Sequence, residues 1–252
     1  MVKLGIVGKG GVGKTTVAAT LSKLLAERGY EVLAVDADPD PDLAYSLGLD
    51  ECPTPVVERD DLIEERTGAP PGTTLGAVFR VNPRVSDLPD RLAVEVEPGL
   101  RLLVVGRVED AGEGCFCPAA ALARRLIRHV VADRDEAIVV DTDAGLEHFG
   151  RRVLEAVDWV VIVCEPSVKS FKNARESARL ARRLGIDRVA LVRNKWVEGV
   201  DGPDVDVDAS VTIPESSKLK RLELQGRPVW EDETVREACE ELLDRMLELQ
   251  RG

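Results

Sequence analysis

Several kinds of residue are scarce in this sequence of 252 residues, and each shortage excludes a class of protein. No run approaches the roughly 20 uninterrupted apolar residues of a membrane-spanning helix, and the first residues do not resemble a secretory signal. Basic residues are outnumbered, with 34 Lys and Arg against 46 Asp and Glu, so the formal charge of −12 disfavours non-specific binding to nucleic acid or to an anionic membrane. We therefore expect a cytoplasmic protein that binds neither.

Amide and thiol side chains are also few. Three Asn and two Gln among many Glu, Arg and Val residues are typical of proteins that work at high temperature. Five cysteines in a reducing cytoplasm do not indicate a disulfide framework, so a close pair is more naturally a metal or redox site. Such a pair occurs in the run GEGCFCP, as Cys115 and Cys117.

Apolar runs short enough to be buried strands alternate with helical segments along most of the chain. This alternation predicts an α/β fold with right-handed crossovers, in which a mostly parallel, twisted sheet has helices on both faces, and we expect one domain over residues 1–252. A Pro-Gly pair inside residues 92–105 predicts a β-hairpin at one edge. The predicted strands cover residues 2–7, 31–38, 100–105, 136–143, 158–166 and 187–194.

The run GKGGVGKTT follows the first predicted strand and precedes a helix predicted over residues 17–29. It contains the pattern G-x-x-x-x-G-K-[ST], in which backbone N–H groups and a helix N-terminus bind phosphates. We expect Lys14 to contact the β- and γ-phosphates of a nucleotide and the Thr15 hydroxyl to bind Mg²⁺. The loop residues predicted to hold the nucleotide are Gly8, Lys9, Gly10, Gly11, Val12, Gly13, Lys14, Thr15 and Thr16.

Acidic residues end two of the predicted strands. Asp141 ends an apolar run, at the sheet edge where open α/β sheets form their nucleotide sites, and we expect it to hold Mg²⁺ through a water molecule. Asp36 and Asp38 end another strand at the same edge. Strand-end acids also cap helices and form turns, so that alternative stays open.

The two close cysteines precede a segment, residues 121–131, whose apolar positions have helical spacing, and Pro118 suits a first helical turn. The positive potential of a helix N-terminus favours a thiolate at Cys117, and a turned C-x-C can place both sulfurs on one tetrahedral ion. Two thiolates are half of a closed site, and two packed thiols are the alternative. The cysteines without close neighbours are interpreted as packing residues: Cys52, Cys164 and Cys239.

Lys9 is a second lysine in the loop and resembles the signature lysine of the deviant Walker A ATPases, which include cell-division and plasmid-partition ATPases and the nitrogenase iron protein. The resemblance implies ATP hydrolysis by a homodimer in which Lys9 reaches the partner's phosphates; a solvated lysine is the alternative. It also implies that Asp38 positions the attacking water and that Asn194 reads adenine. The implied catalytic residues are Lys9, Lys14, Asp38 and Asp141, and the implied nucleotide-binding residues beyond the loop are Asn194, Lys195 and Pro214.

Six runs together closely resemble the accessory ATPases that mature carbon monoxide dehydrogenase: KGGVGKTT, VDADPDPDLAYSLGL, FRVNPRVSDLP, GEGCFCP, DTDAGLEHFGR and VCEPSVKS. The resemblance covers essentially the whole chain, and its specific part is the C-x-C-P run followed by the pattern D-x-x-A-G-L-E-H. It implies a homodimer, dependent on nucleotide and metal, that binds nickel, or zinc in its place, through Cys115 and Cys117. Its client would be carbon monoxide dehydrogenase, into whose cluster it helps to insert nickel. Thiolates accept either metal, so the residues do not choose between them.

Two other functions fit the generic part of the resemblance. A reductase similar to the nitrogenase iron protein would carry an iron–sulfur cluster between subunits, but such proteins use widely spaced single cysteines. A positioning ATPase similar to MinD or ParA would need a basic C-terminal helix as its anchor. Residues 232–252 are acidic here and predict an amphipathic helix docked on the protein.

Overall fold

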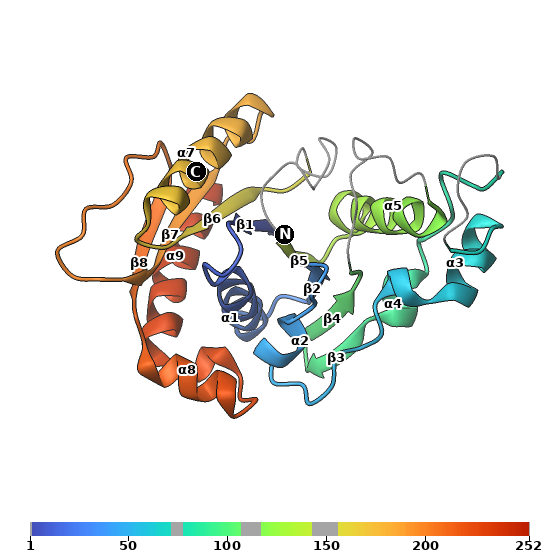
Figure 1. Ribbon diagram of the computed structural model, residues 1–252, viewed down its shortest axis with the longest axis horizontal. Coiled ribbons are helices and arrows are strands. Elements are labelled where there is room, and N and C mark those ends of the chain that lie inside the picture. The colour runs from blue at the N-terminus through green and yellow to red at the C-terminus, as the bar shows by residue number, and fades with distance from the viewer. Residues whose placement is uncertain (1, 72–77, 107–116, 143–155, 252) are drawn as a thin grey trace.

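Eight strands form one twisted sheet in the computed structural model, which describes residues 2–71, 78–106, 117–142 and 156–251 (Figure 1). The strand order is β3-β4-β2-β5-β1-β6-β7-β8, and every neighbouring pair is parallel except β3 and β4. The predicted α/β fold is therefore confirmed. The strands are β1 Lys3–Gly8, β2 Val32–Ala37, β3 Val94–Glu97, β4 Leu100–Val104, β5 Ala137–Thr142, β6 Trp159–Cys164, β7 Val189–Trp196 and β8 Ala209–Pro214.

Helices cover both faces of the sheet (Figure 1). One core packs the sheet against α1 and α9, and the other packs the opposite face against α3, α5 and α7. Because both faces are covered, every residue of β1, β5 and β6 is buried. The described helices are α1 Lys14–Glu27, α2 Leu43–Ser46, α3 Asp60–Thr67, α4 Leu88–Leu92, α5 Pro118–Asp133, α7 Val168–Arg183, α8 Ser217–Leu224 and α9 Glu233–Arg251, with 3-10 turns at Val56–Glu58 and Val229–Glu231.

The predicted hairpin is present at one edge of the sheet. Strands β3 and β4 pair antiparallel and are joined through Gly99, whose φ of 82° is a left-handed conformation that glycine adopts readily. The acidic C-terminal segment is also as predicted, since α9 buries Val235, Cys239 and Met246 against the core. No described helix is long and apolar enough to cross a membrane.

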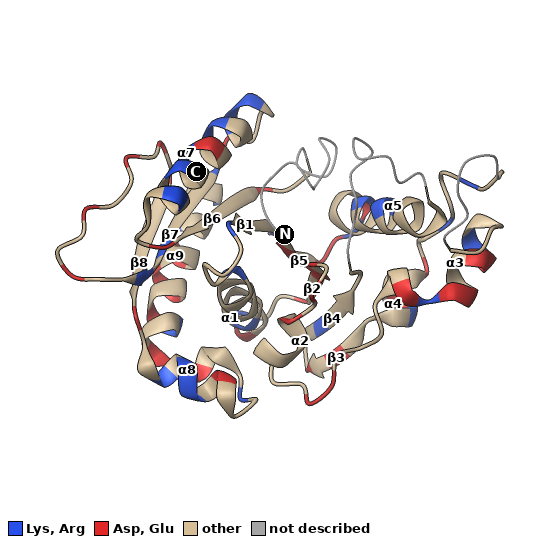
Figure 2. Cartoon of the chain, viewed as in Figure 1, with Lys and Arg blue, Asp and Glu red and all other residues tan. Residues whose placement is uncertain are grey.

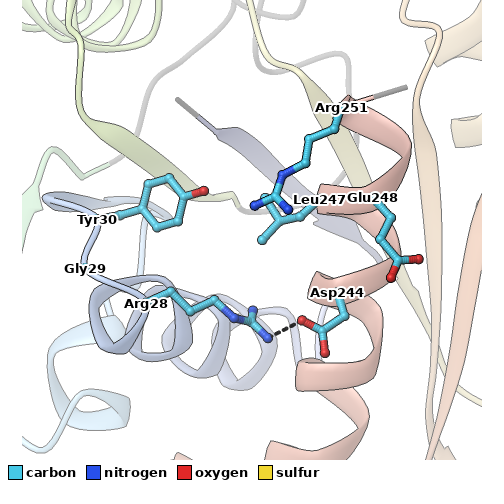
Figure 3. Close-up of a pocket in the computed structure, with 7 residues that line it drawn as sticks. All are labelled: Arg28, Gly29, Tyr30, Asp244, Leu247, Glu248 and Arg251. Atoms are coloured by element: carbon cyan, nitrogen blue, oxygen red, sulfur yellow. Dashed lines mark hydrogen bonds and ion pairs between the residues drawn. The ribbon is translucent and has the colours of Figure 1, made fainter.

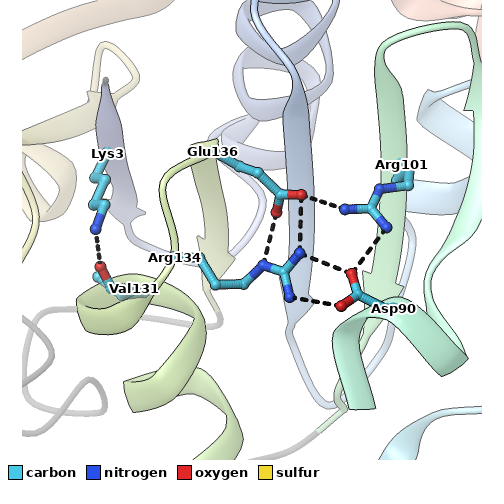
Figure 4. Close-up of polar contacts among 6 residues, drawn as sticks. All are labelled: Lys3, Asp90, Arg101, Val131, Arg134 and Glu136. Atoms are coloured by element: carbon cyan, nitrogen blue, oxygen red, sulfur yellow. Dashed lines mark hydrogen bonds and ion pairs between the residues drawn. The ribbon is translucent and has the colours of Figure 1, made fainter. Parts of the chain in front are cut away.

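Charged side chains join the helices to the edge of the sheet where its parallel strands begin (Figure 4). Arg134, after α5, contacts both Asp90 of α4 and Glu136, which precedes β5. Arg101 of β4 contacts the same two carboxylates. Nearby, Lys3 donates a 2.6 Å hydrogen bond to the carbonyl of Val131 near the end of α5. These contacts hold the edge opposite the predicted phosphate-binding loop.

Basic residues gather on α7 although the chain as a whole is acidic (Figure 2). The acidic loop between β7 and β8 neutralises part of this positive charge, because Arg182 of α7 pairs with Asp208 at 3.0 Å. The exposed basic residues of α7 are Lys169, Lys172, Arg175, Arg179 and Arg183.

Candidate functional site

A cleft of about 500 Å³ opens beside the phosphate-binding loop, at the edge of the sheet where the parallel strands end. This is the edge at which open α/β sheets bind nucleotides. Residues from three segments far apart in the sequence meet there, as the predicted site requires. The predicted residues that line the cleft are Gly10, Gly11, Gly13, Lys14, Thr15, Thr16, Asp38, Asn194, Lys195 and Pro214.

Two glycines of the loop are required by the closeness of its packing. Gly8 ends β1, and a Cβ added there would lie 2.3 Å from the carbonyl oxygen of Val163 on β6. Gly13 has a φ of 94°, and its Cβ would lie 2.2 Å from Nδ2 of Asn194 on β7. Real Cβ atoms do not approach other atoms so closely. The loop is therefore held against two strands with its backbone facing the cleft, which suits a phosphate cradle.

The two loop lysines have opposite surroundings. Lys14, the first residue of α1, is only 6% exposed although it carries a charge. Lys9 is exposed, and its carbonyl accepts a long turn hydrogen bond of 3.4 Å from the N–H of Val12. Of these two lysines, only Lys14 lines the cleft of its own chain.

Asp141 is a buried acid without a hydrogen-bond partner. It is 1% exposed, and neither of its carboxylate oxygens has a hydrogen-bond partner within the part of the chain that is described. Burial and, less strongly, the charge of Asp36 raise the pKa of Asp141 to about 8, while Thr15 and Lys14 oppose the rise. A buried carboxylate without a partner lowers the stability of the folded protein. A cation bound beside Thr15 would supply the missing partner for its oxygens.

Asp36 is a second buried acid beside it, to which the sequence alone assigned no role of its own. The strand register sets Asp36 on β2 opposite Asp141 on β5. Its carboxylate accepts hydrogen bonds from the N–H groups of Leu43, at 3.0 Å, and Asp38, at 3.1 Å. Burial raises the pKa of Asp36 to about 7 in spite of these two donors. Asp36 therefore fixes the turn that leads into α2, which begins at Leu43.

Asp38, by contrast, lines the cleft itself. It is half-buried, and its Oδ1 accepts a 3.0 Å hydrogen bond from the N–H of Asp40. The turn held by Asp36 therefore presents Asp38 on the wall of the cleft, where a water-positioning carboxylate would need to lie.

The end of β7 contacts the loop directly. Asn194 is 2% exposed and donates a 2.8 Å hydrogen bond from Nδ2 to the carbonyl of Val12. Lys195 donates from Nζ to the carbonyl of Gly11 at 2.6 Å. Pro214, at the end of β8, pairs with Trp196 and is exposed at the cleft. The sequence placed all three residues at the nucleotide, but it gave no sign that two of them hold the loop.

Cys117 begins α5. It is the N-cap residue, and its Sγ accepts a 3.5 Å hydrogen bond from the N–H of Ala120, while Pro118 is the first helical residue as predicted. Cys115 lies outside the described residues, so the geometry of the C-x-C pair is not part of the structure. Among the residues described, no three His, Cys, Asp or Glu side chains are grouped to hold a metal ion.

The other described cysteines are free thiols. Burial raises the pKa of Cys164 to about 11 and that of Cys239 to about 12, so both stay protonated in the core. Cys52 is half-buried, and its thiol donates to the carbonyl of Pro53. The interpretation of Cys164 and Cys239 as packing residues is confirmed by their full burial.

A second cavity of about 510 Å³ lies between the end of α1 and the end of α9 (Figure 3). Its charged residues are of both signs, and Arg28 is paired with Asp244 at 2.5 Å. It lies where β2 begins, which is the edge opposite the phosphate-binding loop. We therefore take the cleft at the loop as the candidate site.

A phosphate-binding loop between the first strand and the first helix of an open, mostly parallel sheet defines a P-loop nucleoside triphosphatase. Residues 6–229 match the family described as the CobQ/CobB/MinD/ParA nucleotide binding domain, and the chain belongs to this family of ATPases.

Two relatives and one solved structure illustrate the membership. An uncharacterized ATP-binding protein of Methanocaldococcus jannaschii is 39% identical over 98% of each chain. The carbon monoxide dehydrogenase accessory protein CooC of Rhodospirillum rubrum is 43% identical over 79% of this chain and 76% of its own. The MinC:MinD cell division protein complex of Aquifex aeolicus is similar in fold, with a TM-score of 0.68, 21% identity and coverage of 100% of this chain and 96% of the other.

Proposed function

We propose that the protein is a cytoplasmic, homodimeric ATPase that assists nickel insertion into carbon monoxide dehydrogenase. The observation that carries this proposal is the 43% identity with an accessory protein of that enzyme, in a chain whose Cys117, in the C-x-C-P run, is the N-cap residue of α5. ATP is the substrate, and nickel, or zinc in its place, is the cargo. Neither nucleic acid nor membrane is a partner in this proposal.

Two residues that line the cleft, together with the buried Asp141, fit a nucleotide with Mg²⁺. Lys14 binds the β- and γ-phosphates, and Thr15 binds Mg²⁺ directly, with Asp141 acting through a water molecule. The unpaired carboxylate of Asp141 supports this assignment, because a nearby cation would relieve its burial. Bound Mg²⁺ would neutralise charge on the phosphates, while Asp38, on the cleft wall, positions the attacking water.

Asn194 supplies a physical reason for ATP rather than GTP. Its Nδ2 is engaged with Val12, which leaves Oδ1 as the acceptor that can face a base. An acceptor there pairs with the exocyclic amine of adenine, whereas guanine presents an acceptor at the same position. Pro214 at the cleft would flank that base.

We expect ATP to outcompete GTP by about a hundredfold in competition for a fluorescent ADP analogue, and Asn194→Ala to reduce this ratio several-fold. The reason is that a mismatched base leaves a buried polar group unpaired. Ser210→Ala is a suitable control, because Ser210 lies on β8 away from the cleft. Equal competition by GTP in the unaltered protein would rule out Asn194 as the base reader.

The metal site in this proposal is shared between two subunits. A single C-x-C pair supplies two thiolates, whereas a closed tetrahedral site needs four ligands. Two copies related by a two-fold axis bring the same segment together twice. At the start of α5, the N–H of Ala120 donates a hydrogen bond to the sulfur of Cys117. The bound nucleotide would then change metal affinity, because the geometry of the dimer sets the distance between the two C-x-C pairs.

The decisive experiment is elemental analysis of protein purified without chelators, combined with sedimentation in ATP and in ADP. We expect one Ni²⁺ or Zn²⁺ per dimer, and each of Cys115→Ser and Cys117→Ser to abolish tight metal binding while ATP affinity stays within about twofold. Cys52→Ser is the matched control and should keep the metal, because Cys52 lies outside the C-x-C run. One metal per monomer, or metal retained after both substitutions, would refute the shared site.

A further inference from the structure

Strand β7 is irregular at the point where it meets the phosphate-binding loop. Its register with β8 shifts between Arg193 and Trp196, which marks a bulge at the two residues between them. One of these, Lys195, has a φ of 53°, and among the described residues it is the one non-glycine with a positive φ. Lysine rarely adopts this conformation, and backbone of this kind persists where surrounding contacts fix it.

The bulge turns two consecutive side chains toward the same target. In a regular strand Asn194 and Lys195 would point to opposite faces of the sheet. Here Asn194 donates to the carbonyl of Val12 at 2.8 Å, and Lys195 donates to the carbonyl of Gly11 at 2.6 Å. Adjacent residues of β7 thus hold adjacent carbonyls of the loop. Bulges are used in this way to redirect a side chain beside an active site.

Holding these carbonyls also orients the amides of the loop. A trans peptide is planar, and its N–H points away from its C=O. When Lys195 holds the carbonyl of Gly11, the N–H of Val12 is turned to the other side, where it donates the hydrogen bond to the carbonyl of Lys9 that closes the turn of the loop. When Asn194 holds the carbonyl of Val12, the N–H of Gly13 is turned likewise. Phosphate binding by such a loop depends on the direction of its N–H groups.

We propose that Lys195 is a positioning residue, which through its hydrogen bond to Gly11 sets the loop in its phosphate-binding shape before a nucleotide arrives. Its ammonium acts on the loop and not on the phosphates. The bulge and the positive φ of Lys195 are the structural means by which strand β7 delivers this contact. The expected effect of Lys195 on nucleotide affinity rests on the proposed ATP site, whereas its expected effect on the shape of the empty loop does not.

The test compares three substitutions of Lys195 with a matched control. Lys195→Asn removes the ammonium but keeps a residue that tolerates positive φ, Lys195→Gly also removes the backbone constraint, and Lys195→Arg keeps a cationic donor. Lys220→Asn is the control, because Lys220 lines the same cleft but pairs with Glu215 at 2.5 Å. It therefore removes the same charge from the cleft without removing a contact to the loop.

The first measurement is amide hydrogen exchange at Val12, whose N–H is hydrogen-bonded to the carbonyl of Lys9, in the nucleotide-free protein. We expect Lys195→Asn and Lys195→Gly to speed exchange there about tenfold, Lys195→Arg to restore most of the protection, and Lys220→Asn to change it less than twofold. The second measurement is affinity for ADP and for ATP. We expect Lys195→Asn to weaken both about tenfold by the same factor, because the loop and not a particular phosphate is affected.

Each result decides the proposal. Unchanged exchange in Lys195→Asn would overturn the hydrogen bond as a support of the empty loop, whether or not the protein hydrolyses ATP. Faster exchange with unaltered ADP and ATP affinity would show that the contact does not position the cradle. A loss of affinity for ATP much larger than for ADP would assign Lys195 to the γ-phosphate instead. Faster exchange with equal losses, rescued by Lys195→Arg, establishes the positioning role.

Discussion

Replacing Asp141 with Asn is expected to abolish ATP turnover and, at the same time, to raise the free energy of unfolding of the nucleotide-free protein. The loss of turnover should be about a hundredfold or more, because the neutral amide no longer helps to hold Mg²⁺. The gain in stability follows from burial. Asp141 is 1% exposed with both oxygens unpaired in the described part of the chain, so its charge opposes folding while no cation is bound.

The pH dependence identifies the cause of that gain. Since burial raises the pKa of Asp141 to about 8, the folded protein holds a proton that the unfolded chain, with an ordinary pKa of about 4, has released. Stability therefore falls as pH rises between these values, by at most about 1.4 kcal/mol per pH unit for this group. Asp141→Asn lacks this loss, so its advantage should grow from pH 5 to pH 8 and then level off.

Thermal or urea unfolding in EDTA, at several pH values between 5 and 9, measures the difference. The control is Asp206→Asn, which removes the same charge from a side chain that is 92% exposed and should change stability by less than about 0.5 kcal/mol at every pH. Asp36 is present in both proteins, but its charge is coupled to that of Asp141, so Asp141→Asn also lowers the pKa of Asp36 and this adds to the advantage at high pH. An Asp141→Asn protein that is less stable than the unaltered one at pH 8 would mean that the carboxylate has a structural partner.

The stability gain, if Mg²⁺ is the missing partner, should reverse when nucleotide and Mg²⁺ are present. Ligand that binds only the folded state stabilises it by an amount that grows with affinity. The unaltered protein should gain several degrees in Tm from ATP and Mg²⁺, and Asp141→Asn should gain less. Asp141→Asn would then be the more stable protein without ligand and the less stable one with ATP and Mg²⁺. Such a reversal is typical of a residue that serves function and destabilises the fold.

The strands and the phosphate-binding loop follow from local sequence. Apolar runs such as residues 158–166 are long enough for a strand and too short for a core helix, and the glycine pattern of residues 8–16 has a known local conformation. The predicted helix over residues 17–29 begins three residues earlier, at Lys14. The reason is that Gly13, in a left-handed conformation, ends the loop directly before it.

Residues 51–91 show where local sequence is insufficient. Their six prolines and weak periodicity gave no element, yet the structure has α3 and α4 there. Both helices are short, and isolated helices of such length are not stable in water. They form because Ile63 and Leu88 are fully buried in the core beneath them, a contact that only the tertiary fold supplies.

The pairing of Asp36 with Asp141 is a second such case. The two residues are more than 100 positions apart, and their side-by-side placement depends on the register of β2 against β5. Similarly, the sequence marks Asn194 and Lys195 as neighbours, but a regular strand would separate their side chains. The bulge that brings both to the loop has no local signal such as glycine or proline.

Replacing Lys9 with Ala is expected to abolish ATP hydrolysis while leaving nucleotide affinity nearly intact. Lys9 is exposed and does not line the cleft of its own chain, whereas Lys14 is buried within it. If Lys9 completes the site of a partner subunit, its loss removes charge stabilisation that develops only in the dimer, as when a residue is supplied in trans to a phosphoryl transfer. A fall in kcat of about a hundredfold or more is expected, with ADP affinity changed less than about threefold.

Sedimentation in ATP and in ADP separates this cause from simple damage to the loop. The unaltered protein should dimerise with ATP, and Lys9→Ala should remain monomeric at the same concentration. Lys14→Ala should instead lose nucleotide affinity itself, because it removes a group from the chain's own cradle. Lys172→Ala, at a side chain 78% exposed on α7, removes an equal charge and should behave as the unaltered protein.

Mixing Lys9→Ala with an excess of Asp141→Asn gives the strictest test, since each mixed dimer then has one site with both Asp141 and a partner's Lys9. Recovery of hydrolysis in that mixture requires Lys9 to act across the interface, and its absence, with mixed dimers present, would leave Lys9 as a residue of its own chain.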